Sequence, residues 1–314
     1  MKKTAAKKPA KKAPARIEVA GTAITHPEKV LFPEEGITKQ ELAEYYEAIA
    51  PLMLPHLRGR PVTMERFPSG IGEKGFLHKN LTRGFPAWIE RVETPKNDGT
   101  VNYLIVNDVR SLIWMTNQNT ITPHVWISRV PNLFYPDICL VDLDPSIDDQ
   151  DMLRAAVLEV RDVLAALGLK SWVKTSGSKG FHVVVPLDRS TNMHQVAGFA
   201  HAVGSLLVRN DPDRLTQEFS KADRGRRILV DTGRNGYSAT VAAAYAVRPK
   251  PGAPVSAPCT WAEVESGAAS PRSFTLRTMA ARVAEVGDPW ADMLEHGQSQ
   301  SLRDAIDAVG KLRE

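Results

Sequence analysis

The chain has 314 residues, of which 43% are hydrophobic and 24% are charged. This composition predicts a globular protein with one large domain or two ordinary ones. Its two cysteines, Cys139 and Cys259, lie far apart and form no CxxC pair, which argues against a disulfide framework or a zinc site and fits a reducing cytoplasm. No apolar run approaches the length of a membrane-spanning helix, so we expect no membrane partner.

The net charge of +4 is unevenly distributed along the chain. Residues 1–16 carry seven Lys or Arg side chains and no acid, so removing their +7 leaves −3 for the remainder. Lys, Ala and Pro dominate this segment, which predicts a disordered basic tail without the apolar region of a secretory signal. Such a tail can bind a polyanion by releasing its counterions, or can act only as a solubilising segment. We favour nucleic acid binding.

The first structured region should begin near residue 17 and lead into a helix. Thr38 starts the capping-box pattern TKQE, after which apolar residues recur at helical spacing. Pro51 and Pro55 are expected to interrupt this helix. Lys29 and Lys39 flank the preceding turn, where together they can hold a phosphate, although each alone also suits an ordinary surface position.

Residues 60–67 predict a strand, followed by the segment 72–80, which reads GEKGFLHKN. Basic residues, among them Lys79, alternate here with Phe76. An aromatic ring among basic residues suits stacking on a nucleobase while the phosphates are neutralised. A buried Phe76 is an equally good interpretation of this segment alone.

Further strands are predicted over residues 101–106 and 122–128, with a helix over 109–118 between them. The second of these strands carries His124. A single histidine in such a strand is more often structural than catalytic.

Residues 138–145 read ICLVDLDP, a short apolar run that ends in Asp142 and Asp144. The run predicts a buried strand. Residues two apart in a strand point to the same face, so both carboxylates should project together from its end. Carboxylates this close repel unless protons or cations lie between them, and hard divalent cations take such oxygen ligands. A bare DxD also occurs where both acids are simply solvated.

A helix predicted over 149–167 is followed by strands over 171–175 and 181–185, which enclose the loop SGSKG. Glycines flanked by hydroxyls and a lysine let backbone N–H groups approach an anion. The spacing is not that of a Walker A loop, and an ordinary hairpin turn is the alternative. The residues concerned are Ser176, Lys179, Gly180 and His182.

The C-terminal half adds a third acid. A helix is predicted over 194–207, and the basic cluster at 224–227 leads into a strand that ends at Asp231, with Arg234 beyond it. Residues 241–247 are β-like, and 261–314 read as helices. Three carboxylates can hold two divalent cations, the usual means of stabilising both oxygens of a phosphoryl displacement.

The order of DLDP, SGSKGFH and VDxxRN resembles the polymerase domain of bacterial ligase D, which belongs to the archaeo-eukaryotic primase superfamily. KVLFPEEGITK, RPVTMERFP, GFLHKN, ITPHVW and FTLRT extend the resemblance over nearly the whole chain after the tail. It implies an α+β primase-polymerase fold with an RRM-like catalytic sheet packed with a second α/β layer. We therefore expect a tail over 1–16, a catalytic domain over 17–300 and a C-terminal helix over 301–314.

The resemblance also implies roles for individual residues. The residues that match its metal ligands, for two Mn²⁺ or Mg²⁺ ions, are Asp142, Asp144 and Asp231. Those that match its nucleotide site are Ser176, Lys179, Gly180, His182 and Arg234, together with His124 near the incoming sugar, where it would favour ribonucleotides. The residues expected at DNA are Lys29 and Lys39 at a 5′-phosphate, Phe76 stacking on the template, and Lys79 and Arg224.

Two positions depart from the family pattern. Leu77 stands where the family has a second stacking phenylalanine, and His26 stands where it often has asparagine. The first change weakens or reshapes the expected template contact. The second change bears on the expected recognition of the 5′-phosphate.

The predicted function is a template-dependent polymerase that adds nucleotides, with a preference for ribonucleotides, at short gaps or breaks in repair of the non-homologous end joining type. Its expected partners are gapped or broken DNA with a 5′-phosphate, NTP or dNTP, a Ku-type protein and a separate DNA ligase, in the cytoplasm at the nucleoid. One alternative is a primase-polymerase for excision-repair gap filling or lesion bypass. Another is a non-catalytic DNA end-binding module, which the complete set of aspartates disfavours.

Overall fold

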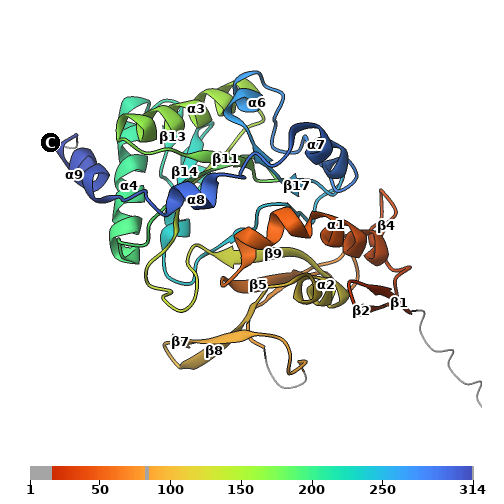
Figure 1. The fold of residues 1–314 in the computed structure, drawn as a ribbon. Coiled ribbons are helices and arrows are strands. Elements are labelled where there is room, and N and C mark those ends of the chain that lie inside the picture. Colours follow the sequence, from red (N-terminus) through yellow and green to blue (C-terminus); the bar gives the residue numbers. More distant parts are fainter. Residues whose placement is uncertain (1–15, 82–84, 313–314) are drawn as a thin grey trace, which may run out of the picture.

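The computed structural model describes residues 16–81 and 85–312. The predicted tail falls on residues that lie outside this range, except Arg16, which begins strand β1. Two six-stranded sheets dominate the fold, one in the upper and one in the lower half of Figure 1. We call them sheet I and sheet II. The predicted mixed α and β architecture with two layers is confirmed.

Sheet I has the strand order β13-β14-β10-β12-β11-β18, with antiparallel pairing throughout except between β13 and β14. Its strands are β10 (Ile138–Pro145), β11 (Trp172–Thr175), β12 (Phe181–Pro186), β13 (Leu215–Thr216), β14 (Ile228–Asp231) and β18 (Pro258–Cys259). Helices α3 (Gln150–Ala166) and α4 (Met193–Asn210) cover one of its faces. The strands and helices expected in this region are confirmed to within a few residues.

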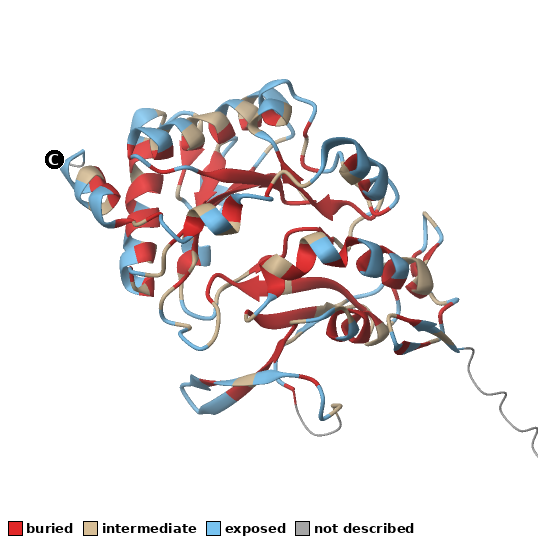
Figure 2. Cartoon of the chain, in the orientation of Figure 1, coloured by how far each residue is buried: buried red, intermediate tan, exposed pale blue. Residues whose placement is uncertain are grey.

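Sheet II has the order β15-β9-β5-β8-β7, and β6 pairs with β5 outside this path. Its strands are β5 (Pro61–Arg66), β6 (Phe76–His78), β7 (Arg91–Lys96), β8 (Gly99–Ile105), β9 (Thr120–Trp126) and β15 (Thr240–Ala242). Helices α1 (Lys39–Leu57) and α2 (Val109–Asn117) pack against it. Strand β7 is mostly exposed, whereas β8 and the central strands of both sheets are mostly buried (Figure 2).

Shorter elements complete the fold. Three small ribbons pair β1 (Arg16–Val19) with β2 (Thr22–Thr25), β3 (Val30–Phe32) with β4 (Ile37–Thr38), and β16 (Ala246–Val247) with β17 (Val255–Ser256). The remaining helical segments are α5 (Lys221–Arg224), η1 (Gly233–Asn235), α6 (Trp261–Glu265), α7 (Met279–Val286), α8 (Met293–Gly297) and α9 (Arg303–Lys311). The β-like stretch 241–247 is therefore split between two strands. No helix in the described ranges is long and apolar enough to cross a membrane.

Side chains along β10 alternate between two hydrophobic cores. Cys139, Val141 and Leu143 pack with α3 and α4 on the outer face of sheet I. Ile138 and Leu140 belong instead to the larger core, which also contains α1 and sheet II. Because successive residues of a strand point to opposite faces, the aspartates that continue this inner series face the side of sheet I turned toward sheet II.

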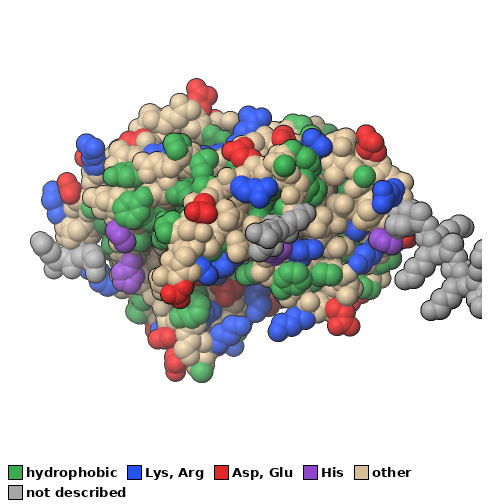
Figure 3. All heavy atoms as spheres, turned by 90° about the horizontal axis from the view of Figure 1, so that it is seen from below, with side chains coloured by type: hydrophobic (Ala, Val, Ile, Leu, Met, Phe, Trp, Pro, Cys, Tyr) green, Lys and Arg blue, Asp and Glu red, His purple; other side chains and the backbone are tan. Residues whose placement is uncertain are grey.

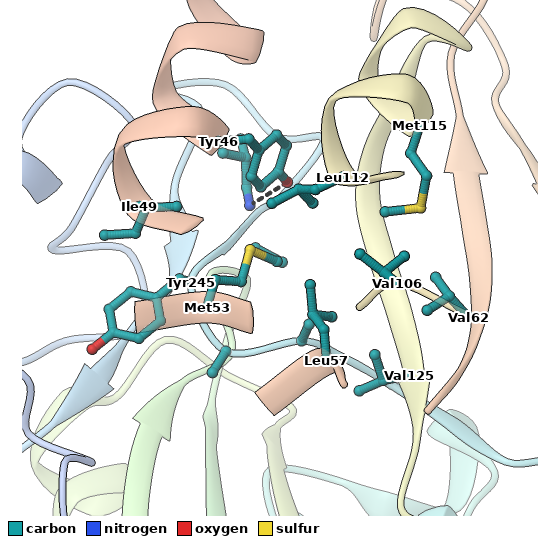
Figure 4. Packing of buried hydrophobic residues seen from close by; sticks show 14 of the residues in the cluster. Tyr46, Ile49, Met53, Leu57, Val62, Val106, Leu112, Met115, Val125 and Tyr245 are labelled. Carbon is teal, nitrogen blue, oxygen red and sulfur yellow. Dashed lines mark hydrogen bonds between the residues drawn. The ribbon is translucent and has the colours of Figure 1, made fainter. Parts of the chain in front are cut away.

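Helix α1 runs through both of its prolines, so the predicted interruption is wrong. Thr38 caps its N-terminus by accepting a hydrogen bond from the backbone N–H of Glu41 at 3.2 Å. Figure 4 shows Tyr46, Ile49, Met53 and Leu57 of α1 pointing into the core formed with α2 and sheet II. Burial of these side chains offsets the hydrogen bonds that the prolines cannot donate.

Helix α9 is not a separate appendage. It packs against α4, and its apolar residues Ala305 and Val309 belong to the core on the outer face of sheet I. The expected C-terminal helix is present, and it is part of the same hydrophobic unit as the strands that carry the aspartates.

A buried ion pair joins the two sheets. Arg60, just before β5, donates from both terminal nitrogens to the two carboxylate oxygens of Asp137, just before β10, at 2.7 Å each. Arg129 adds a third charged donor at 2.6 Å. The Arg60 side chain is only 2% exposed, so its charge is compensated almost entirely by this carboxylate.

We expect Asp137→Asn to destabilise the protein by about 3–5 kcal/mol, because it leaves buried arginine charge uncompensated. Denaturant unfolding followed by circular dichroism measures the change. Asp162→Asn, which removes one exposed acid paired with Arg161, is the matched control and should change stability by less than about 1 kcal/mol. Equal effects of the two substitutions would show that the pair between the sheets contributes no special stability.

Candidate active site

A row of polar residues crosses the inner face of sheet I. Asp142 of β10 lies directly opposite Asp231 of β14 on one side and His182 of β12 on the other. His182 lies in turn opposite Lys174 of β11. The strand pairing therefore places four titratable side chains from four strands next to one another. The sequence predicted three of them, and the register brings these three together.

The predicted glycine-rich loop connects β11 to β12 beside this row. The hydroxyl oxygen of Ser176 accepts hydrogen bonds from the backbone N–H groups of Ser178 at 3.2 Å and Gly180 at 3.0 Å. A Cβ atom on Gly180 would lie 1.6 Å from the carbonyl oxygen of Leu143, so only glycine fits there. Lys179 is exposed at the tip of the loop.

These residues line one cavity of about 390 Å³. Its walls include the predicted residues Asp142, Asp144, Asp231, Ser176, Lys179, Gly180, His182 and Arg234. Three carboxylates and several cationic donors thus share one concave site, as binding of a polyphosphate with its cations requires.

Two arginines pair with the carboxylates. Arg234 lies 3.4 Å from Asp231, and Gly233 donates its backbone N–H to the other Asp231 oxygen at 2.8 Å. Arg224 donates to Asp144 at 3.2 Å and also to two backbone carbonyls in the segment before α5. The sequence had suggested that Arg224 contacts DNA. Its side chain is only 5% exposed, so Arg224 lies inside the site and not on an open surface.

The environment of Asp142 opposes its ionisation. Burial, and then the neighbouring Asp231, raise the pKa of Asp142 to about 7, even though Arg234 acts in the opposite direction. Burial also holds the pKa of His182 well below its ordinary value, with the charge of Lys174 adding to the effect. The imidazole is therefore neutral at pH 7.

The carboxylates supply oxygen donors of the kind that Mg²⁺ and Mn²⁺ prefer. Asp142 and Asp231 face each other, and burial, followed by repulsion from Asp231, raises the pKa of Asp142; a bound cation would relieve that repulsion. No group of three acidic, His or Cys side chains in residues 16–81 and 85–312 is arranged to hold a metal ion. Asp144 pairs with Arg224 at 3.2 Å.

Sequence analysis did not identify three further residues of this region. Arg248 lines the cavity and donates to the carbonyl oxygen of Ser176 at 2.8 Å. Glu65 pairs with the predicted His124 at 2.8 Å, and neither residue lines the cavity. Lys174 extends the row on sheet I. In the sequence, each of these residues is only a charged residue within or next to an apolar strand. Charged residues also occur at ordinary strand ends, so this pattern does not identify a functional residue.

The two lysines predicted at a 5′-phosphate lie near each other but differ in exposure. Lys29 is half-buried and donates to the carbonyl oxygen of Pro68. Lys39 is 2% exposed, and its amine donates to the carbonyl oxygen of Thr25 at 2.7 Å. Burial, and then the charge of Lys29, lower the pKa of Lys39 to about 8. His26, three residues before Lys29, adopts a positive φ of 53°, a conformation that asparagine tolerates better.

Phe76 and its neighbours lie on the surface. Phe76 is 47% exposed and Leu77 is 62% exposed, so the alternative of a buried Phe76 is excluded. Arg66 approaches the Phe76 ring at 5.4 Å, and Lys79, the residue directly after β6, is exposed. Figure 3 shows Lys and Arg side chains with hydrophobic ones between them on the face seen from below.

One exposed aromatic residue stands at the cavity itself. Phe219 is 73% exposed and lines the site, and its carbonyl oxygen accepts a hydrogen bond from the buried Arg224 at 2.9 Å. The pairing of Arg224 with Asp144 therefore also holds the backbone at Phe219. Sequence analysis did not single out this residue.

Comparison with known proteins agrees with this architecture. The family model of the LigD primase-polymerase domain matches residues 38–290. The polymerase domain of Mycobacterium tuberculosis ligase D, solved in complex with DNA, superposes with a TM-score of 0.82 at 32% identity and covers 87% of this chain and 97% of that one. Fold and site together define a polymerase domain of the nucleotidyltransferase class.

Full-length relatives are considerably longer. The chain is 35% identical over 281 residues to the multifunctional non-homologous end joining protein LigD of Pseudomonas aeruginosa, covering 88% of this chain and 33% of that protein. It is 33% identical over 297 residues to the LigD protein of Mycolicibacterium smegmatis, covering 90% and 38%. The chain belongs to the LigD primase-polymerase domain family, which is metal-dependent, and spans about a third of the length of these relatives.

We expect Asp142→Asn to stabilise the metal-free protein at pH 8. The folded state raises the pKa of Asp142 from its ordinary value of 3.8 to about 7. Between these two pH values the folded protein holds a proton that the unfolded chain has lost, so stability falls as pH rises from 3.8 to about 7. The uncharged amide removes this effect, so thermal unfolding in EDTA should occur a few degrees higher than in the wild type at pH 8 and at a similar temperature near pH 4.

The control is Asp148→Asn, which neutralises an exposed acid after β10 and should leave the melting temperature unchanged. A lower melting temperature for Asp142→Asn than for the wild type at pH 8 would contradict the raised pKa of Asp142.

Proposed function

We propose that this domain adds nucleotides to primer ends at short gaps or breaks in DNA, directed by the template strand, in repair of the non-homologous end joining type. The observation that carries the proposal is the single cavity that combines Asp142, Asp144 and Asp231 with cationic and hydroxyl donors. Carboxylates and cationic donors that line the same cavity suit a nucleoside triphosphate whose α-phosphate is the reacting centre.

In the reaction, the primer 3′-oxygen forms a bond to the α-phosphorus while the bond to the β-phosphate oxygen breaks, releasing pyrophosphate and a proton. Bound Mg²⁺ or Mn²⁺ ions, two in the proposed site, would stabilise the attacking and leaving oxygens. The chain's own donors orient the triphosphate and neutralise charge that passes to pyrophosphate: Ser176, Lys179, His182, Arg234 and Arg248.

Specific contacts extend the proposal to the substrate. We propose that His124, which pairs with Glu65, contacts the incoming sugar and so favours ribonucleotides. Phe76 and Lys79 provide a stacking and charged surface for the template. Phe219 offers a second exposed ring at the cavity, which offsets the loss of stacking area at Leu77.

We further propose that the domain acts at the nucleoid in the cytoplasm with a Ku-type end-binding protein and a separate DNA ligase. The relatives named for non-homologous end joining support this placement. Gap filling in excision repair uses the same chemistry, and only the preferred DNA substrate separates the two functions.

Asp142→Ala and Asp144→Ala should each reduce nucleotide addition by roughly two to three orders of magnitude, because each removes charge that stabilises the transition state. DNA binding should change little, since phosphate contacts elsewhere dominate it. The measurement is extension of a labelled primer with NTP or dNTP and Mn²⁺ or Mg²⁺, on gapped, overhanging and unprimed templates.

Extension by the wild type rules out a purely non-catalytic end-binding module. A preference for gapped or overhanging ends supports end joining, whereas efficient synthesis on unprimed templates would support the primase-polymerase function. Near-normal extension by either aspartate variant would overturn the assignment of the site.

We also expect a preference of about ten-fold for gaps that bear a 5′-phosphate over those that end in hydroxyl, because a phosphate monoester near two lysines carries more than one negative charge. Above pH 8 Lys39 loses its proton, since its pKa is lowered to about 8, and the preference should fall between pH 7 and pH 9. The phosphate gains a little further negative charge over the same range, because its second pKa is about 6, so its own titration cannot cause the fall.

Equilibrium binding to the two gapped DNAs at each pH measures the preference. Lys29→Ala should remove most of it while sparing simple primer extension, and Lys311→Ala, at the end of α9, is the control for loss of one positive charge. Equal affinity for both DNAs at every pH would show that these lysines do not bind the phosphate.

A further inference from the structure

Lys174 lies in the middle of β11 with its side chain inside the protein, only 2% exposed. Burying an ammonium group is costly unless charge or hydrogen bonds compensate for it. In the part of the chain that the structure describes, no carboxylate lies within 4.0 Å of its amine. The amine instead contacts the Nδ1 atom of His182 at 2.8 Å and the hydroxyl oxygen of Ser256 at 2.5 Å. An ordinary buried salt bridge therefore does not explain this lysine.

The direction of these hydrogen bonds follows from the groups that take part. The hydroxyl of Ser256 donates to the carbonyl oxygen of Thr175 at 3.0 Å, so toward Lys174 it acts as an acceptor. The amine of Lys174 has enough N–H groups to donate to Ser256 and to His182 at once. While Lys174 is protonated its amine has no lone pair, so the Nδ1 atom of His182 is the acceptor and the neutral ring carries its proton on Nε2.

The Nε2 atom of His182 points to the reacting side of the row. It lies 3.6 Å from an oxygen of Asp142, and the ring lines the catalytic cavity. With the proton on Nε2 the ring presents a donor to oxygen atoms, whereas the other tautomer would turn a lone pair toward Asp142. A protonated Nε2 atom also cannot act as a metal ligand, which leaves the carboxylates as the metal-binding groups.

We propose that Lys174 is a positioning residue that fixes His182 in the Nε2–H tautomer, so that the ring donates a hydrogen bond to a phosphate oxygen of the incoming nucleotide. The tautomer follows from the contacts of Lys174 alone. The phosphate contact rests on the proposed function, and the two parts can be tested separately.

The tautomer is measured by long-range ¹H–¹⁵N correlation in protein labelled with ¹⁵N-histidine, with the His182 signals assigned by their loss in His182→Gln. We expect protonated Nε2 and unprotonated Nδ1 in the wild type at pH 7, and a loss of this preference in Lys174→Met. Protonated Nδ1 in the wild type, or an unchanged Nε2–H tautomer in Lys174→Met, would overturn the role of Lys174. If Lys174→Met does not fold, the wild-type spectrum still decides the tautomer, and Lys174→Gln tests its dependence on a donor.

The kinetic test compares KM for the nucleotide with the Kd for DNA. We expect Lys174→Met to raise KM about ten-fold with little change in DNA binding, and Lys174→Gln, whose amide can donate, to recover part of this loss. Lys170→Met is the matched control, because this lysine lies just before the same strand but pairs with Asp292 at the surface, and it should not change KM.

An unchanged KM in Lys174→Met with the tautomer lost would remove the phosphate contact from the proposal. If the wild type adds no nucleotides at all, the proposed function fails, while the spectra still decide whether Lys174 fixes the tautomer.

Discussion

The pairing register of β10 is the constraint on which the site depends. This register sets Asp142 opposite both Asp231 and His182. A shift of β10 by one residue would turn its aspartates toward the core on the outer face of sheet I. The alternating apolar residues of β10 resist such a shift, because they fill two different cores. The packing that stabilises sheet I thus also holds two carboxylates against each other, and repulsion between them is built into the fold.

Cationic groups surround this repulsion without neutralising all of it. Arg234 and Arg224 each pair with one carboxylate, while Lys174, at the end of the row, contacts His182. A polyphosphate with its cations fits this pattern, because its metals meet the acids and its oxygens meet the remaining donors. The electrostatic arrangement is therefore in place before substrate binds, which is the condition for strong transition-state stabilisation.

The sequence predicted the local parts of this arrangement well. Each local part has a sequence pattern that spans only a few consecutive residues. These parts are the apolar run before Asp142, the SGSKG loop and the strand that ends at Asp231. Lys174, Arg248 and the Asp142–Asp231 pairing depend on contacts between strands distant in the chain, for which periodicity gives no signal. Likewise Arg224 and Lys39 are charged residues with an expected surface role, and only the packed structure shows that both are buried.

Sheet I carries the proposed catalytic residues, whereas the lysines and aromatic rings proposed to hold DNA belong mainly to sheet II and the segments that precede it. One continuous core spans the inner faces of both sheets, and the Arg60–Asp137 pair joins them at the strands that lead to each part. The distance between the proposed phosphate-binding lysines and Asp142 is thus fixed by interior packing, without a flexible linker. If the lysines bind the far side of a gap, this rigid separation limits how many nucleotides fit between that phosphate and the reacting primer end. The preference for short gaps then follows from the core of the protein and does not need a separate measuring element.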